Sequence, residues 1–154
     1  KKKLAYYDSA LNESYIPYVV ETSVGLDRLF LSVLCGSFVE ENINNESRTL
    51  LKLPAYLAPV GVAILPLLKK DGLNNTARDI FNDLKAKFSC HYEEKDSIGK
   101  RYRRQDAIGT PICVTIDHDT LKDNQVTIRD RDTMEQQRVS LNQLSDFITK
   151  KLDV

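Results

Sequence analysis

Two short runs of consecutive apolar residues constrain the fold of this chain more than any other feature. Residues 60–65 (Val-Gly-Val-Ala-Ile-Leu) and residues 112–116 (Ile-Cys-Val-Thr-Ile) are rich in β-branched side chains and contain no charge. A strand with one wet face alternates apolar and polar residues, whereas a strand covered on both faces is apolar throughout. Both runs therefore predict fully buried strands at the centre of a sheet that is covered by helices.

The segments around these runs predict the other elements of the sheet. Further strands are expected at residues 90–92, 126–129 and 136–139. Helices are expected at residues 74–88, within residues 97–108, and after the capping box of Ser140 and Gln143. Asn74 and Asn75 are side chains that commonly cap a helix start. Strands that alternate with helices and end in a hairpin predict an α/β fold with a mixed five-stranded sheet flanked by helices.

The first 40 residues follow a different pattern, which predicts a β-hairpin and a helix. Residues 4–7 and 15–20 are rich in aromatic and β-branched residues, and turn-forming residues separate them. Apolar residues at helical spacing up to Phe38 then predict a helix that opens near Gly25. We expect these elements to be the C-terminal remnant of a larger domain.

A polar, asparagine-rich stretch after this helix is typical of a linker or a mobile loop. We therefore expect three parts: residues 1–40, a linker at residues 41–57, and a second domain at residues 58–154.

The charge of the chain excludes a wholly basic nucleic-acid-binding protein but not a local basic patch. Its 154 residues carry 22 Lys and Arg against 22 Asp and Glu, so the formal net charge is zero. Attraction to phosphate depends on where charge lies on the surface as well as on its total. No apolar stretch reaches the roughly 18 residues of a membrane span. The start of the chain has no apolar signal core and the 3 cysteines are far apart, so we expect a cytoplasmic protein that does not bind membranes.

One candidate ligand site lies at residues 21–28 (Glu-Thr-Ser-Val-Gly-Leu-Asp-Arg). Gly25 lets a ligand approach the backbone, the first helical turn offers free N–H groups to an anion, and Arg28 adds a guanidinium group. Glu21 and Ser23 are two residues apart on the expected strand, so they face the same side and together suit an ammonium group. From spacing alone, an ordinary strand-to-helix turn with a capping serine explains the same residues.

Two other segments combine features that are typical of nucleic-acid binding. Residues 98–104 hold four basic residues within five positions, with a tyrosine among them, and phosphate and single-stranded bases favour this mixture. Residues 126–133 place Arg129 and Arg131 on one face of a strand and the intervening aspartates on the other. A solvated helix face in the first case, and cross-strand ion pairs in the second, are the structural alternatives.

The order of these segments resembles one enzyme family over essentially the whole chain. Residues 15–30 (Tyr-Ile-Pro-Tyr-Val-Val-Glu-Thr-Ser-Val-Gly-Leu-Asp-Arg-Leu-Phe) are similar to the third signature motif of class II aminoacyl-tRNA synthetases, in the form found in homodimeric glycyl-tRNA synthetases. The region from Ala58 onward resembles the C-terminal anticodon-binding domain of the glycyl, histidyl, prolyl and threonyl enzymes. Residues 97–102, 108–111 and 126–132 carry that second similarity.

The resemblance implies a role for each matching residue. It implies that glycine is bound by Glu21, Thr22, Ser23, Val24 and Gly25, with Glu21 on the amino group. ATP would be bound by Gly25, Leu26, Asp27 and Arg28, of which Arg28 is the catalytic arginine on a phosphate. The anticodon would be contacted by Lys100, Arg103, Arg104, Thr120, Arg129 and Arg131. Glycine has no side chain to grip, so its selection must depend on its charged ends and on a tight pocket.

The chain departs from the family pattern in one place. The family commonly has proline between the glutamate and the serine, where this chain has Thr22, and threonine keeps the extended backbone. The first two class II motifs are expected upstream of residue 1. We therefore expect the C-terminal fragment of a longer enzyme, inactive by itself and holding no cofactor.

That parent enzyme would attach glycine to tRNA(Gly) with ATP as substrate and Mg²⁺ as metal, and would be a homodimer. Two alternatives stay open: another class II synthetase of the prolyl, threonyl or histidyl group, and a non-catalytic RNA-binding accessory module.

Overall fold

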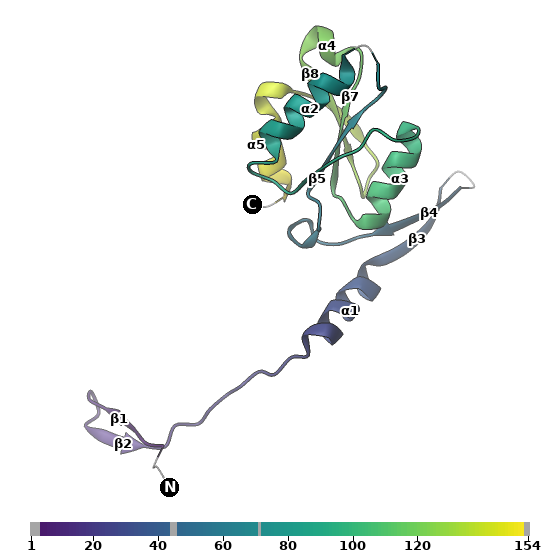
Figure 1. Ribbon diagram of the computed structural model, residues 1–154. Helices are drawn as coiled ribbons and strands as arrows, with labels where there is room; N and C mark the ends of the chain where they lie inside the picture. The colour runs from purple at the N-terminus through teal and green to yellow at the C-terminus, as the bar shows by residue number, and fades with distance from the viewer. Residues whose placement is uncertain (1–3, 44–45, 71, 153–154) are drawn as a thin grey trace.

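A five-stranded sheet forms the centre of the larger part of the protein (Figure 1). The computed structural model describes residues 4–43, 46–70 and 72–152. The strands of this sheet are β5 (Val62–Pro66), β6 (Cys90–Tyr92), β7 (Ile112–Ile116), β8 (Gln125–Asp130) and β9 (Gln136–Ser140). Their order is β6-β5-β7-β8-β9; β5 runs parallel to β6 and β7, and β8 runs antiparallel to β7 and β9. The expected mixed five-stranded sheet is thus confirmed.

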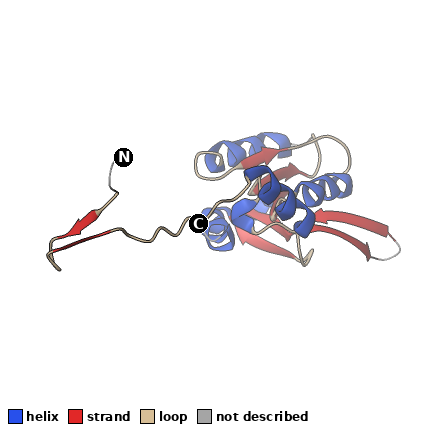
Figure 2. Ribbon diagram, turned by 90° about the horizontal axis from the view of Figure 1, so that it is seen from below, coloured by secondary structure: helices blue, strands red, loops and turns tan. Residues whose placement is uncertain are grey.

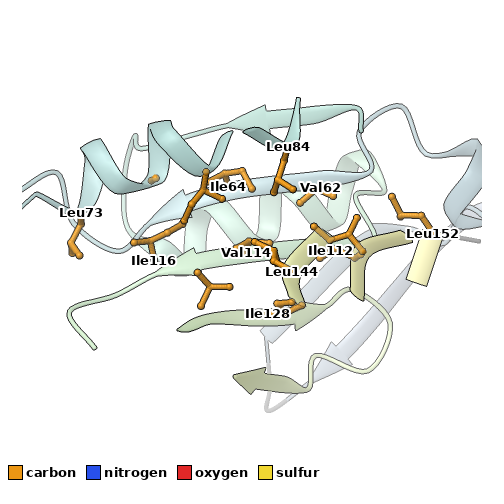
Figure 3. Close-up of a cluster of buried hydrophobic side chains, with 14 residues drawn as sticks. Val62, Ile64, Leu73, Leu84, Ile112, Val114, Ile116, Ile128, Leu144 and Leu152 are labelled. Carbon is orange, nitrogen blue, oxygen red and sulfur yellow. The ribbon is translucent and has the colours of Figure 1, made fainter. Parts of the chain in front are cut away.

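The helices around the sheet are α2 (Leu73–Leu84), α3 (Ile98–Ile108), the single turn α4 (Thr120–Asp123) and α5 (Leu141–Leu152). Alternate residues of β5 point to opposite faces, so Val62 and Ile64 pack with α2 and α5, while Ala63 and Leu65 pack against Ile98 of α3. Figure 3 shows the larger cluster, in which side chains of β5, β7 and β8 meet Leu84 of α2 and Leu144 and Leu152 of α5. Both faces of β5 and β7 are therefore covered, which explains their uniformly apolar sequences.

The start of α2 differs from the expectation that Asn74 or Asn75 caps it. The N-cap is Gly72, in the left-handed conformation with φ of 81°, and no side chain caps the helix. Both asparagines lie inside the first turn, and α2 ends at Leu84, four residues before the expected end. Glycine tolerates this backbone conformation at no steric cost, which lets the chain turn into the helix without a capping side chain.

The N-terminal hairpin and helix are confirmed, but the second expected strand is shorter than predicted. Strands β1 (Tyr6–Asp8) and β2 (Glu13–Tyr15) form an antiparallel pair, and helix α1 spans Leu26–Ser37. Residues 16–25 have no regular secondary structure and stand away from the sheet (Figure 2). Tyr18 is fully exposed, and no described strand lies beside this segment to pair with it. The sequence there has the composition of a strand, but a strand forms only where a neighbour supplies hydrogen bonds.

The stretch expected to be a linker contains a second hairpin. Strand β3 (Phe38–Ile43) follows α1 directly and pairs antiparallel with β4 (Glu46–Leu51). A 3₁₀ turn at Ala55–Leu57 leads on to β5. Residues 44 and 45, part of the expected mobile loop, lie outside the described residues. In the ranges that the structure describes, no helix is long and apolar enough to cross a membrane.

Candidate nucleic-acid interface

Strands β5, β6 and β7 are parallel, so the loops that follow them lie at the same end of the sheet. We call this end, where the strands have their carboxyl ends, the carboxyl edge. From β5 the chain moves to one side to form β6, and then crosses to the other side to form β7. In open α/β sheets, ligands usually bind at the carboxyl ends of the strands at the point where the strand order reverses in this way. The carboxyl edge is therefore the place where this fold is most suited to binding.

Arg101 of α3 holds two of these loops together. Its side chain is buried, and its guanidinium donates hydrogen bonds to the backbone oxygens of Pro66 (2.6 Å), Leu67 (3.1 Å) and Glu93 (3.2 Å). Burial lowers the pKa of Arg101, partly offset by attraction to Glu93. Arg101 belongs to the basic segment at residues 98–104, but it is buried and holds two loops together, so it adds no charge to the surface.

Three lysines supply unneutralised positive charge at this edge. Lys69 follows β5, Lys95 follows β6, and Lys100 lies in the first turn of α3; all three are exposed. None of them makes an ion pair within residues 4–43, 46–70 and 72–152. Free ammonium groups of this kind suit phosphate oxygens.

Arg103 and Arg104 also reach the surface of α3, but acidic side chains already engage them. Arg103 pairs with Glu46 of β4 at 3.2 Å. Arg104 pairs with Glu93 at 2.6 Å and with Asp96 at 3.0 Å. Both guanidinium groups would have to exchange these partners, at least in part, to bind RNA.

Asp117 organises the loop after β7. Its carboxylate accepts hydrogen bonds from the backbone N–H of Thr120 (2.9 Å), the hydroxyl of Thr127 (3.1 Å) and the guanidinium of Arg138 (2.7 Å). Burial raises the pKa of Asp117, but these hydrogen bonds outweigh it and hold the pKa below its ordinary value. The loop is therefore fixed before any ligand arrives.

This geometry corrects the expectation for Thr120. Its side chain is buried, and its hydroxyl donates to Asp117 at 3.0 Å, so it holds the loop and does not face the solvent. Arg138 of β9 is about one-third exposed beside it and also pairs with Asp123 at 2.9 Å. Sequence reasoning missed Arg138 because its partner Asp117 is 21 residues away and no local pattern links the two.

The structure also corrects the expectation for Arg129 and Arg131. Arg129 lies in β8 and Arg131 directly follows its last residue, Asp130, and the two arginines are only 5% and 4% exposed. Arg129 forms an ion pair with the buried Asp106 of α3 at 2.8 Å. Arg131 donates to the backbone oxygens of Leu51, Leu53 and Gly109. Their donor groups are used inside the protein, so neither residue is available to an anticodon.

The segment expected to bind glycine and ATP lies in a different place. Residues 21–28 are all exposed; they lead into α1 and form its first turn, at the end of the helix that points away from the sheet in Figure 1. The N-cap of α1 is Gly25, no side chain caps the helix, and Arg28 lies in the first helical turn. Because residues 16–25 form no strand, Glu21 and Ser23 are not held on one face of a sheet in this structure.

The described residues contain no group of three or more His, Cys, Asp or Glu side chains that is able to hold a metal ion.

Known proteins similar to this chain are glycine–tRNA ligases. The ligase of Chlorobaculum tepidum is 47% identical over 151 residues, which is 98% of this chain and 32% of that protein. Those of Caldanaerobacter subterraneus subsp. tengcongensis and Staphylococcus aureus are 51% identical over 149 residues and 52% identical over 148 residues, which is 97% and 95% of this chain and 32% of each ligase. The chain spans about one-third of the length of these curated relatives.

The model of one protein family, described as the anticodon binding domain, matches residues 61–151. The match begins just before β5 and ends within α5, so it covers the whole five-stranded sheet with its helices. The family expected from the sequence is confirmed: this chain belongs to the anticodon-binding domain family, in a form similar to that of glycine–tRNA ligases.

Proposed function

We propose that this chain is the C-terminal third of a glycine–tRNA ligase and that its sheet domain binds the anticodon loop of tRNA(Gly). One observation carries the proposal: the similarity to glycine–tRNA ligases extends over 95–98% of the chain, so it includes both the anticodon-binding domain and the segment at residues 21–28. An unrelated RNA-binding module that had only borrowed the domain would have no reason to keep that segment.

The anticodon loop would bind at the carboxyl edge. The exposed Lys69, Lys95 and Lys100 suit the loop phosphates, while Arg138 and the neighbouring polar groups suit base edges. Arg103 and Arg104 would contribute after exchanging their carboxylate partners. The chain has no net charge, so the attraction to RNA must come from basic side chains that lie close together on the surface. Such a local patch favours binding of a short anticodon loop over binding along a long RNA backbone.

The remainder of the ligase would complete the catalytic site. In the whole enzyme, Glu21, Thr22, Ser23, Val24 and Gly25 would line the glycine site, and Gly25, Leu26, Asp27 and Arg28 the ATP site. The carboxylate of glycine would attack the α-phosphorus of ATP and release pyrophosphate, and a terminal hydroxyl of the tRNA would then displace AMP. Both steps need positioning and positive charge, which Arg28 supplies, and neither needs a side-chain nucleophile.

The whole ligase would use Mg²⁺, work in the cytoplasm and form a homodimer.

Binding of anticodon stem-loops to the 154-residue chain tests the RNA-binding part. Glycine anticodons have cytosine at the second and third positions, and changing either cytosine to adenine should weaken binding by about 5- to 150-fold, the cost of losing a base contact. Lys100→Ala should weaken binding to all stem-loops alike and lower the salt slope by about 1. Equal affinity for every anticodon would disprove the proposal.

A second experiment tests the ligase itself. The full-length enzyme should catalyse ATP–pyrophosphate exchange that depends on glycine and not on proline or threonine, and Arg28→Ala should abolish most of that exchange. Exchange that responds to proline or threonine instead would assign the chain to another class II synthetase.

A further inference from the structure

The β3–β4 hairpin connects helix α1 to the anticodon-binding domain without a flexible joint. Helix α1 ends at Ser37 and β3 begins at Phe38, so the helix runs directly into the strand (Figure 1). The backbone N–H of Lys52, just beyond β4, donates to the oxygen of Ser37 at 2.6 Å. Any change in the direction of the hairpin must therefore turn α1 with it.

Arg48 is the residue that attaches this hairpin to the domain. Its side chain is fully buried between β4 and α3. The guanidinium donates through Nε to Asp106 at 2.9 Å, through Nη1 to Glu41 at 3.0 Å, and through Nη2 to the backbone oxygen of Arg131. One side chain thus joins β3, α3 and the end of β8.

The charges around Arg48 balance. Asp106 accepts from Arg129 as well as from Arg48, and Glu41 lies directly opposite Arg48 in the hairpin register. Burial lowers the pKa of Arg48, but hydrogen bonds and attraction to Asp106 and Glu41 outweigh it, so the guanidinium stays charged. The guanidinium group of Arg48 is rigid and planar, and it has three hydrogen-bond partners. It therefore fixes the direction of the hairpin more strictly than an apolar side chain of the same size does.

The base of the hairpin is held in a second way. Arg131 donates to the backbone oxygens of Leu51, the last residue of β4, and of Leu53, two residues further along the chain. Gly109 approaches the same backbone so closely that an added Cβ would lie 3.0 Å from the oxygen of Leu51. These contacts fix the base of the hairpin, and Arg48 fixes its direction.

Helix α1 is not itself packed tightly on the domain. An apolar cleft of about 420 Å³ separates Leu29, Phe30 and Val33 of α1 from Leu53 and Ile108. Because this face of α1 is only loosely in contact with the domain, the direction of the helix depends on the hairpin.

We propose that Arg48 is a positioning residue that holds α1, and with it the Gly25–Arg28 turn, in one orientation relative to the anticodon-binding domain. The consequence for catalysis rests on the proposed function: an anticodon bound at the carboxyl edge and an ATP site at the start of α1 would be parts of one rigid frame. Arg48 would then couple correct anticodon binding to the charging of tRNA. In some proteins, buried charged groups fix one geometry and add little to stability.

The orientation is tested by a distance measurement on this chain. A spin label on the exposed Cys35 of α1 and a second one at Ser145→Cys of α5, with Cys90→Ala to remove the half-buried thiol, report the distance between helix and domain. The parent protein should give one narrow distance distribution. Arg48→Met should broaden it, while Asp106 keeps the hydrogen bonds from Arg129 and remains paired.

Lys151→Met is the matched control. It removes a positive charge whose ion pair with Asp130, at 2.7 Å, lies within the domain and does not involve the hairpin. This variant should leave the distance distribution narrow. A narrow distribution in Arg48→Met would overturn the proposal.

The coupling is tested in the full-length ligase. Arg48→Met should leave the affinity for the cognate stem-loop and the glycine-dependent exchange unchanged, but reduce the discrimination between cognate and altered anticodons in charging by about 5- to 150-fold. A parallel loss of stem-loop affinity would show a merely structural role and would also overturn the coupling. If the wild-type domain fails to distinguish anticodons, the proposed function fails, whereas the distance measurement still decides the orientation.

Discussion

The guanidinium of Arg129 donates hydrogen bonds to both carboxylate oxygens of Asp106, at 2.8 and 3.1 Å. Asp106 is completely buried, and the ring of Tyr102 lies 4.8 Å from the centre of the guanidinium group. Arg48 donates a third hydrogen bond to the same carboxylate. An arginine to which the family resemblance assigns an anticodon contact thus joins β8 to α3, and through Asp106 to β4.

Arg129→Met should therefore reduce stability. Removing one partner of a buried ion pair typically costs about 3–5 kcal/mol, and we expect the lower end because Arg48 still neutralises Asp106. Urea-induced unfolding measures this loss, and Lys151→Met, which removes a surface ion pair, should cost no more than about 1 kcal/mol. Wild-type stability combined with a selective loss of stem-loop binding would instead restore Arg129 as an RNA contact.

Gly109→Ala should destabilise the junction between α3 and the β4 hairpin. Gly109 has φ of 85°, and a Cβ there would lie 3.0 Å from the oxygen of Leu51. Backbone strain of this kind costs about 1–3 kcal/mol. Gly99→Ala is the control, because a Cβ at Gly99 meets no atom within 4 Å and the residue lies in α3, where alanine is favoured by about 0.5–1 kcal/mol. Thermal unfolding should move the two variants in opposite directions, and equal shifts would contradict the steric argument.

Stability should fall in acid because of the hydrogen-bonded carboxylate of Asp117. Its pKa is lower in the folded protein than in the unfolded chain, so unfolding takes up a proton and becomes easier as the pH drops. The contribution of Asp117 is complete above the ordinary carboxyl pKa of about 3.9 and is lost as the pH falls through the lower folded value. Urea unfolding at several pH values between about 2 and 6 measures this decline.

Asp117→Asn should flatten the acid decline. Asp83→Asn is the comparison, because Asp83 is exposed and makes no ion pair within the described ranges of the chain. An acid profile that is unchanged in Asp117→Asn would show that its hydrogen bonds do not stabilise the folded state.

The three cysteines should differ in reactivity towards iodoacetamide. Burial raises the pKa of Cys113 to about 12 and that of Cys90 to about 11, so neither forms the reactive thiolate at neutral pH. Cys35 is exposed on α1. Mass spectrometry should find rapid modification at Cys35 alone in the folded chain and at all three positions in urea. Rapid labelling of Cys113 without denaturant would show that the interface of α3 with the sheet opens readily.

The amino-acid sequence by itself determined the central architecture of this protein. The apolar runs of β5 and β7 and the helical periodicity of α2 and α5 are local patterns, and the burial of these apolar residues follows from the hydrophobic effect whatever the details of packing. The family could also be recognised from linear motifs, because the comparisons match the same segments.

Only the tertiary structure decided which polar residues face the solvent. Arg101, Arg129 and Arg131 belong to sequences typical of RNA binding, yet each is buried. The partners that hold Arg129 and Arg48 inside, above all Asp106 at separations of 23 and 58 residues, come from other elements. A charge is buried only where several distant groups converge to replace its water, and no local pattern encodes that convergence.

The same reason explains two of the differences in secondary structure. The strand expected at residues 15–20 has no described neighbour with which to pair, and the expected linker forms a hairpin because Arg48 and Leu50 are buried in the domain. The composition of each segment determined which secondary structure it favours. The tertiary structure decided whether that secondary structure formed, because the hydrogen bonds and ion pairs that stabilise it join residues that are remote in the sequence.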